Sequence, residues 1–173
     1  MKLYLIRHAI AADRDEFASS GQRDQDRPLT KGGIERLDNV VRGLVRLERR
    51  IDQIYTSPYL RAKQTAEIVA KAYSLVPRTL EALIPDSAPE ELVPCLKKCH
   101  TDGMSSLAFV GHEPDLSRLV SWLTIGKTRQ FLFFKKAGVC CLKLTEQFGP
   151  GRAAVVWSLG PSQLVKMGKK SAS

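Results

Sequence analysis

The chain has 173 residues, of which 43% are hydrophobic and 26% are charged. This length and composition are typical of one globular domain, and they exclude a disordered chain, a collagen and a simple coiled coil. The 27 lysines and arginines outnumber the 18 acidic residues, so the formal net charge is +9 and favours anionic partners.

The N-terminal part of the chain shows strand and helix patterns in turn. Residues 3–6 are a continuous apolar run, which is typical of a strand buried on both faces. Residues 11–28 are polar and aperiodic, and we expect a long loop there. Thr30 can cap a helix, because apolar residues then recur every ~3.6 residues as far as Val45.

The middle of the chain repeats this alternation. Apolar runs predict a second strand over 51–56 and a third over 107–110. Ser57 can cap the helix that follows the second strand, with Pro58 in the favoured first position. A shorter helix is expected over 89–99.

The C-terminal part contains a helix that opens at Pro114, followed by strand patterns over 131–134, 139–144 and 153–159. Strands that alternate with helices pair in parallel through right-handed crossovers, whereas the last two strands, joined by a turn, would pair antiparallel. We therefore predict an α/β fold, in which a mixed, mostly parallel sheet is flanked by helices in a three-layer α/β/α domain.

The predicted domain spans residues 1–165, and the lysine-rich residues 166–173 are expected to form a flexible basic tail. The chain has no block of five or six like charges and no basic motif interleaved with aromatics, so nucleic acid is not an expected partner. No apolar run approaches the ~18 residues of a membrane span, and the N-terminus does not resemble a secretory signal. We expect a cytoplasmic protein without a membrane partner.

The four cysteines are expected to be reduced thiols packed as small hydrophobic side chains. Cys140 and Cys141 are adjacent in an apolar run, which is a poor geometry for a mutual disulfide. Cys95, Cys99 and His100 could share part of a helix surface, but no second Cys/His pair follows at zinc spacing. No metal or other cofactor is therefore expected.

Polar side chains with related chemistry follow three of the expected strands. Arg7 and His8 end the first, Arg61 lies one turn into the helix after the second, and His112 follows the third. Each alone could be a structural histidine or a solvated arginine. Ligands of open α/β sheets bind beyond the carboxyl ends of the strands, so all four could converge on one pocket. Two arginines beside a helix N-terminus predict a phosphate site.

Several segments resemble the histidine phosphatase (phosphoglycerate mutase-like) superfamily. LYLIRHA at 3–9 resembles its opening strand and Arg-His-Gly signature. TSPYLRAKQTAEIV at 56–69 and FVGHEP at 109–114 resemble its second-arginine helix and its second-histidine segment. RPLTKGG at 27–33 and WSLGPSQL at 157–164 are similar to the compact SixA-type phosphohistidine phosphatases. Each motif alone is weak or moderate, but three in the right order are specific.

The resemblance implies a role for each of the four residues. His8 would be the nucleophile that becomes phosphorylated, and water would release phosphate in a second step. Arg7 and Arg61 would hold the phosphoryl oxygens with their planar donor groups, and His112 would donate to the same phosphoryl group. The reaction would need no metal.

The chain departs from the family pattern at two positions. Ala9 stands where many members have glycine. Ala82 stands where the proton donor, a carboxylate in a Leu-x-Glu segment, is normally found. Glu81 is one residue away and would point to the other side of an extended segment, so it is a weak candidate proton donor. Asp86 or a loop carboxylate is a further alternative.

The function implied by this resemblance is a metal-independent phosphatase that acts through phospho-His8. The expected substrate is a phosphohistidine-bearing protein, such as a phosphotransfer domain. One alternative is a small-molecule phosphomonoesterase of the same superfamily, although the extra loops that enclose small substrates are scarce here. Another is a non-catalytic phosphoprotein-binding module, which the presence of all four core residues disfavours.

Overall fold

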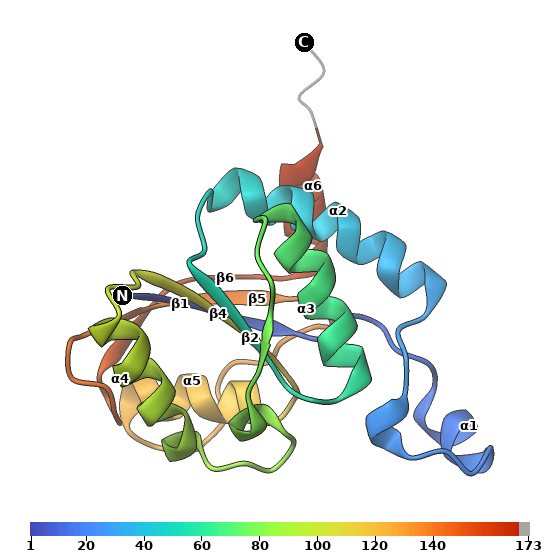
Figure 1. The fold of residues 1–173 in the computed structure, drawn as a ribbon, viewed down its shortest axis with the longest axis horizontal. Coiled ribbons are helices and arrows are strands. Elements are labelled where there is room, and N and C mark those ends of the chain that lie inside the picture. Colours follow the sequence, from blue (N-terminus) through green and yellow to red (C-terminus); the bar gives the residue numbers. More distant parts are fainter. Residues whose placement is uncertain (170–173) are drawn as a thin grey trace.

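The computed structural model describes residues 1–169, which form one sheet with helices on both faces. The strands are β1 (Lys2–Arg7), β2 (Gln53–Thr56), β3 (Arg78–Thr79), β4 (Ser106–Gly111), β5 (Val139–Leu144) and β6 (Ala153–Leu159). The helices are α1 (Arg14–Ser19), α2 (Lys31–Leu47), α3 (Leu60–Ala72), α4 (Val93–Thr101), α5 (Asp115–Ile125) and α6 (Pro161–Gly168). Helices α2, α3 and α6 lie on one side of the sheet, and α4 and α5 lie on the other (Figure 1).

The strand order is β3-β2-β4-β1-β5-β6. The pairs β3–β2, β2–β4 and β4–β1 are parallel, whereas β1–β5 and β5–β6 are antiparallel. This arrangement confirms the predicted three-layer α/β fold with a mixed, mostly parallel sheet. Within residues 1–169, no helix is long and apolar enough to cross a membrane.

The first strand lies at the centre of the sheet and is buried on both faces. Tyr4 and Ile6 belong to the core under α2 and α3, whereas Leu3 and Leu5 belong to the core under α4 and α5. Each of these side chains is at most 1% exposed, and burying one such side chain contributes about 1.5–3 kcal/mol. This burial on both faces explains the continuous apolar run, and it holds the end of β1 rigidly in place.

Helix α2 begins as predicted, because the Thr30 side chain accepts a hydrogen bond from the backbone N–H of Gly33. Helix α6 crosses α2 so closely that a side chain at Gly43 would collide with the carbonyl oxygen of Leu164. Helix α6 continues to Gly168, so the first residues of the predicted tail, 166–168, are helical, and Leu164 anchors this helix in the core. Residues 170–173 of that prediction lie outside the described residues.

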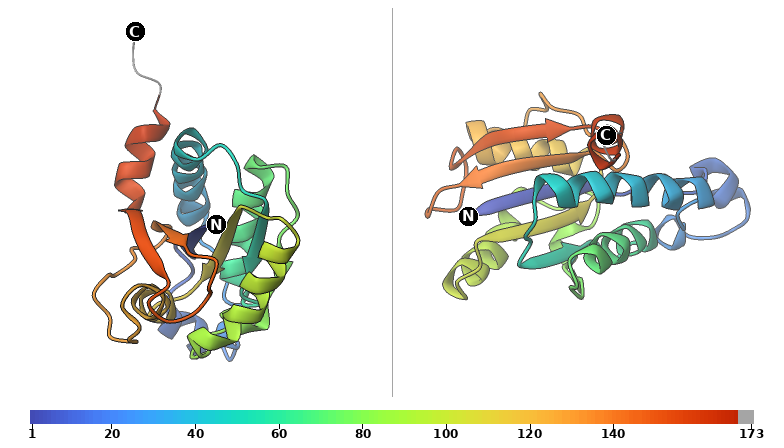
Figure 2. Two further views of the ribbon diagram at one scale, coloured as in Figure 1. Left: turned by 90° about the vertical axis from the view of Figure 1, so that its left-hand side faces the viewer. Right: turned by 90° about the horizontal axis from the view of Figure 1, so that it is seen from above.

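The segment 11–28, predicted as a loop, contains α1 and a short 3₁₀ helix over Asp24–Asp26. The Asp13 side chain caps α1 by accepting hydrogen bonds from the backbone N–H groups of Asp15 and Glu16. The sequence does not predict α1, because this helix buries no side chain and therefore has no apolar pattern. The segment projects beyond the end of the sheet where β1 finishes (Figure 1; Figure 2, right).

Two further predictions are corrected by the structure. Helix α3 begins at Leu60 rather than Pro58, because the backbone of Tyr59 is still extended, and the Ser57 hydroxyl contacts His112 and the backbone of Tyr59. Residues 131–134 form no strand and pair with none among the described residues. The backbone of Phe134 is hydrogen-bonded to side chains instead of to a neighbouring strand.

The four cysteines are free thiols, as predicted. Cys99, Cys140 and Cys141 are buried, and Cys95 is partly buried. All four are packed in the hydrophobic cores, where they act as small apolar side chains.

Candidate active site

The four residues singled out in the sequence lie together at the carboxyl ends of the central strands. Arg7 ends β1 and pairs in register with Gly111 of β4, so His8 and His112 follow side by side. Arg61 lies in the first turn of α3. The four line a cleft of about 590 Å³. The other residues that line it are Ile10, Ala11, Ala12, Asp13, Arg14, Arg27, Pro85, Glu113 and Lys136.

His8 is buried, and one of its ring nitrogens is already occupied. Nδ1 lies 2.7 Å from the carbonyl oxygen of Ala9, which can only accept, so Nδ1 carries the hydrogen and Nε2 carries the lone pair. Burial lowers the pKa of His8 to about 3, and the cationic Arg61, Arg7 and Lys136 add to that shift. His8 is therefore a neutral imidazole with a free lone pair in a cationic cleft.

The backbone around His8 is held from both sides. The His8 N–H donates to the carbonyl oxygen of Gly111 at 3.0 Å, and the Ala9 N–H donates to the Thr65 hydroxyl at 3.0 Å. The same hydroxyl donates to the carbonyl oxygen of Arg61 at 2.7 Å. Thr65 therefore connects the segment after β1 with α3, which fixes His8 relative to Arg61. Sequence analysis missed Thr65, because a helical threonine four residues from an arginine has no distinctive pattern.

His112 is oriented by Ser57, which the sequence suggested only as a helix cap. The Ser57 Oγ accepts a hydrogen bond from the backbone N–H of Tyr59 at 3.3 Å, so its own hydrogen can be donated to His112 Nε2 at 2.9 Å. Nδ1 then carries the ring hydrogen, and it has no hydrogen-bond partner. Burial lowers the pKa of His112 to about 2, with Arg61 and His8 adding to the shift. The two histidine rings lie 5.2 Å apart.

Each of the two arginines keeps an unused donor. Arg7 Nη1 donates to the carbonyl oxygen of Phe134 at 2.6 Å, and its Nε has no partner. Arg61 is 2% exposed and donates through Nη1 to the Asp24 carbonyl oxygen at 2.7 Å, while its Nε has no partner. Buried N–H donors without partners are costly, and a bound anion would satisfy them.

Asp24 connects the segment 11–28 to the cleft. Its carboxylate lies 3.0 Å from Arg61 Nη2 and 3.0 Å from Arg27 Nε, and Arg14 lies 3.5 Å away. Burial alone would raise the pKa of Asp24, but Arg61 and Arg27 outweigh it and hold the pKa below its usual value. Sequence analysis missed Asp24, because nothing in a polar, aperiodic segment distinguishes one aspartate from its neighbours.

The structure does not bring Glu81 into this cleft. Glu81 lies in a 3₁₀ helix and lines a separate hollow with Tyr59 and Lys63, whereas Ala82 and His112 share another hollow. Asp86, the other carboxylate weighed from the sequence, is exposed.

Two carboxylates that sequence analysis passed over do line the cleft, and both are occupied. Asp13 caps α1, and Glu113 accepts hydrogen bonds from the Ser117 hydroxyl and from the backbone N–H of Phe134. Among residues 1–169, no group of three or more His, Cys, Asp or Glu side chains is placed to hold a metal ion. The cleft offers a neutral nucleophile, surrounded by cationic and neutral donors, to a tetrahedral anion.

Comparisons with known proteins relate this chain to one family. The model of the histidine phosphatase superfamily (branch 1) matches residues 3–84, which include Arg7, His8 and Arg61. An uncharacterised protein of Picosynechococcus sp. is 38% identical over 144 residues, which cover 83% of this chain and 85% of that protein.

One further relative and one solved structure are named for an activity. The phosphohistidine phosphatase SixA of Escherichia coli is 28% identical over 178 residues, covering 98% of this chain and 99% of that protein. The structure of the protein histidine phosphatase SixA complexed with tungstate superposes with a TM-score of 0.79 at 25% identity. That superposition covers 95% of this chain and 99% of the other, so the shared fold extends over essentially the whole chain.

Proposed function

Since this chain belongs to the histidine phosphatase superfamily and is a phosphatase, we propose that it removes phosphate from phosphohistidine on a protein, through a phosphorylated His8. The observation that carries the proposal is the state of His8. Its Nδ1 hydrogen is engaged by Ala9, and its Nε2 lone pair is free beside the unused donors of Arg7 and Arg61. The similarity to SixA over nearly the full length supports the substrate class.

In the first step His8 Nε2 attacks the phosphorus atom, and the bond from phosphorus to the substrate imidazole breaks. The electron pair of that bond leaves with the imidazole nitrogen. The Nε hydrogens of Arg7 and Arg61 and the Nδ1 hydrogen of His112 bind the three equatorial oxygens, on which charge accumulates. The other ring nitrogen of the substrate phosphohistidine carries a hydrogen, so the substrate side chain leaves as a neutral imidazole. His8 keeps its hydrogen on Nδ1 and becomes a phosphorylated imidazolium, so the transfer needs no net proton movement.

In the second step water attacks the phosphorus atom of phospho-His8. The bond to Nε2 breaks, its electron pair returns to the ring, and dihydrogen phosphate leaves with both protons of the water. His8 is then again a neutral imidazole with its hydrogen on Nδ1. Ala9 holds this tautomer throughout, because its carbonyl oxygen can only accept.

The surroundings of the cleft favour a nitrogen leaving group over an alkoxide. An alkoxide needs a proton from a positioned acid, which is typically worth 10²–10⁴-fold in rate. The carboxylates among the described residues of the cleft, Asp13 and Glu113, are each occupied by hydrogen-bond donors, and Ala82 has no acidic group. A leaving imidazole has a conjugate acid with a pKa of about 6.5 and needs no such help.

The test is a comparison of kcat/KM on phosphohistidine, p-nitrophenyl phosphate and glycerol phosphate. We expect efficient release from phosphohistidine, weaker release from the activated aryl ester and very little from the alkyl ester. Equal efficiency on glycerol phosphate would contradict the proposal and favour a small-molecule phosphomonoesterase. Binding of phosphohistidine without release would favour a non-catalytic phosphoprotein-binding module.

A further inference from the structure

Residues 127–136, the segment between α5 and β5, present a row of side chains to solvent beside the cleft. Six residues of this segment are exposed: Lys127, Thr128, Arg129, Phe131, Phe133 and Lys135. Phe131 is 51% exposed and Phe133 is 73% exposed, although both are large aromatic side chains. Two exposed phenylalanines on one short row form an apolar patch of the kind that partners cover.

The backbone of this segment is also unpaired. Within the described part of the chain, the N–H and C=O groups of residues 128–133 form no hydrogen bond. The segment is anchored at Phe134, whose N–H donates to Glu113 at 2.6 Å and whose carbonyl oxygen accepts from Arg7 at 2.6 Å. The exposed row is thus attached directly to a residue that lines the cleft.

A second cavity lies between this row of exposed side chains and the cleft, and it shares lining residues with the cleft. It has a volume of about 330 Å³ and is lined by Arg7, Glu113, Pro114, Gln130, Phe133 and Phe134. Arg7 and Glu113 also line the cleft, so the two cavities share a wall. A side chain that neighbours a phosphohistidine bound in the cleft could therefore enter the second cavity and pack on Phe133.

The charge of the segment is entirely positive. Residues 127–136 contain Lys127, Arg129, Lys135 and Lys136 and no acidic residue. None of these four forms an ion pair with another of residues 1–169, whereas Arg14, Arg27 and Arg61 across the cleft share Asp24. Unpaired surface cations attract an acidic partner over about a Debye length, ~10 Å at moderate salt.

On the basis of the proposed function, we propose that residues 127–136 are the docking surface for the phosphohistidine-bearing protein. The partner's complementary surface would carry an apolar side chain next to the phosphohistidine, flanked by carboxylates. The apolar side chain fits the cavity at Phe133, and the carboxylates fit the unpaired cations of the row. Because the second cavity and the cleft share Arg7 and Glu113, the segment suits a protein whose phosphohistidine is bound in the cleft better than a partner that contacts only residues 127–136.

The apolar part is tested with three substrates and two variants. The substrates are a phosphohistidine peptide flanked by leucine and glutamates, the same peptide with serine and lysines instead, and free phosphohistidine. In the double variant Phe131→Ser/Phe133→Ser, kcat/KM on the acidic peptide should fall about tenfold or more, and kcat/KM on free phosphohistidine should stay within about twofold. The control is Val76→Ser. Val76 is 82% exposed and lies beside the start of β2, at the end of the strand away from the cleft, so this variant should leave kcat/KM on both substrates unchanged.

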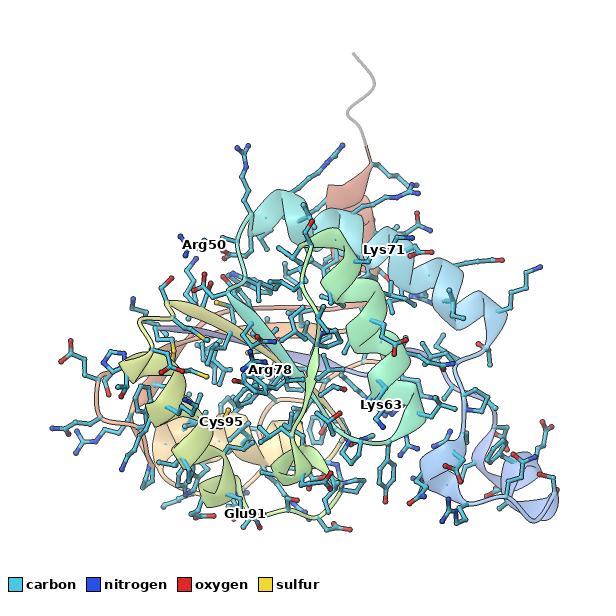
Figure 3. All side chains as sticks on the ribbon, in the orientation of Figure 1. Arg50, Lys63, Lys71, Arg78, Glu91 and Cys95 are labelled. Carbon is cyan, nitrogen blue, oxygen red and sulfur yellow. The ribbon has the colours of Figure 1, made fainter. Side chains whose placement is uncertain are left out.

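The charged part of the docking surface is tested by replacing two of its cations with glutamate. Lys127→Glu/Arg129→Glu should shift the preference from the acidic peptide towards the lysine-containing peptide by about tenfold, and added salt should reduce that shift. Lys71→Glu is the control, because Lys71 is exposed in the last turn of α3 (Figure 3), whereas Arg61 lies in the first turn of that helix. It should leave the preference unchanged.

Three results would overturn the docking surface. Equal losses on free phosphohistidine and on the acidic peptide would mean that the segment only positions Arg7. No loss on either would mean that the row binds nothing. A dimer of the wild-type chain that Phe131→Ser/Phe133→Ser dissociates, or competition by a single-stranded oligonucleotide, would assign the row to another occupant. A wild-type chain that releases no phosphate from free phosphohistidine would instead refute the proposed function.

Discussion

Two segments border the cleft, and they use their charges in opposite ways. In 11–28, Asp24 engages Arg61, Arg27 and Arg14, and the segment folds into short helices against the start of α3. In 127–136, the cations have no acidic partner within residues 1–169, and the backbone is mostly unpaired. The first segment supports a buried guanidinium inside the molecule, whereas the second leaves its charges available to a partner.

Replacing Arg61 breaks the contact between the segment 11–28 and the cleft, because Arg61 bonds to Asp24 of that segment. Arg61→Ala loses a preorganised donor to the phosphoryl group and leaves Asp24 without its buried partner. We expect a loss of roughly 10²–10³-fold in kcat, equivalent to about 3–4 kcal/mol of transition-state stabilisation. Steady-state kinetics on phosphohistidine measure it. The control is Arg50→Ala, because Arg50 (labelled in Figure 3) precedes β2 and so lies at the opposite end of that strand from the cleft. A kcat within about threefold of the wild-type value would remove Arg61 from the site.

The histidines between the two segments should make stability depend on pH. The folded pKa values of His8 and His112, about 3 and about 2, lie below the unfolded value of ~6.5. Between these values the unfolded chain binds more protons, so the free energy of unfolding falls as pH falls below ~6.5. The loss is at most about 2 kcal/mol per histidine by pH 5.

Urea unfolding at pH 7 and at pH 5 measures this loss. In His8→Asn the free energy of unfolding should fall less between pH 7 and pH 5 than in the wild type, because one of the two histidines with a lowered pKa is absent. An identical decline in wild type and variant would show that His8 is protonated in the folded protein at pH 5.

Asp24→Asn removes the negative charge that the segment 11–28 places beside Arg61, and it leaves every cation of the cleft present. In Asp24→Asn the guanidinium of Arg61 keeps its hydrogen bond to the carbonyl oxygen of residue 24 but loses the charged one. We expect kcat/KM to fall about tenfold, the cost of one charge-assisted hydrogen bond of ~1.5 kcal/mol. Asp26→Asn is the matched control, because within residues 1–169 the Asp26 carboxylate pairs only with the exposed Arg23. An unchanged or higher kcat/KM in Asp24→Asn would contradict the positioning role.

A chelator should have the smallest effect. Arg7, Arg61 and His112 already supply donors for the phosphoryl oxygens, so the proposed reaction requires no metal. We expect EDTA to leave the rate of phosphate release from phosphohistidine unchanged. A strict requirement for added Mg²⁺ or Zn²⁺ would refute this part of the mechanism.

The predictable part of the molecule is the part that apolar patterns control. The runs at β1 and β4 are buried on both faces, and their parallel register alone brings Arg7, His8 and His112 together. Arg61 follows because α3 starts directly beyond β2.

The unpredicted part depends on contacts between polar groups that are far apart in the sequence. Asp24 meets Arg61 across 37 residues, and Glu113 meets the backbone of Phe134 across 21 residues. Such pairs leave no periodicity. The apolar residues 131–134 therefore predict a strand, whereas in the structure they pair with none among residues 1–169.

The identity of the phosphorylated residue tests the account at its centre. The chain is mixed with phosphohistidine, the reaction is stopped in alkali, and the trapped phosphoryl group is located by mass spectrometry of the peptides. We predict an acid-labile, alkali-stable phosphoryl group on Nε2 of His8, absent from His8→Asn. A phosphoryl group on a cysteine, a serine or His112, or turnover by His8→Asn at the wild-type rate, would contradict it.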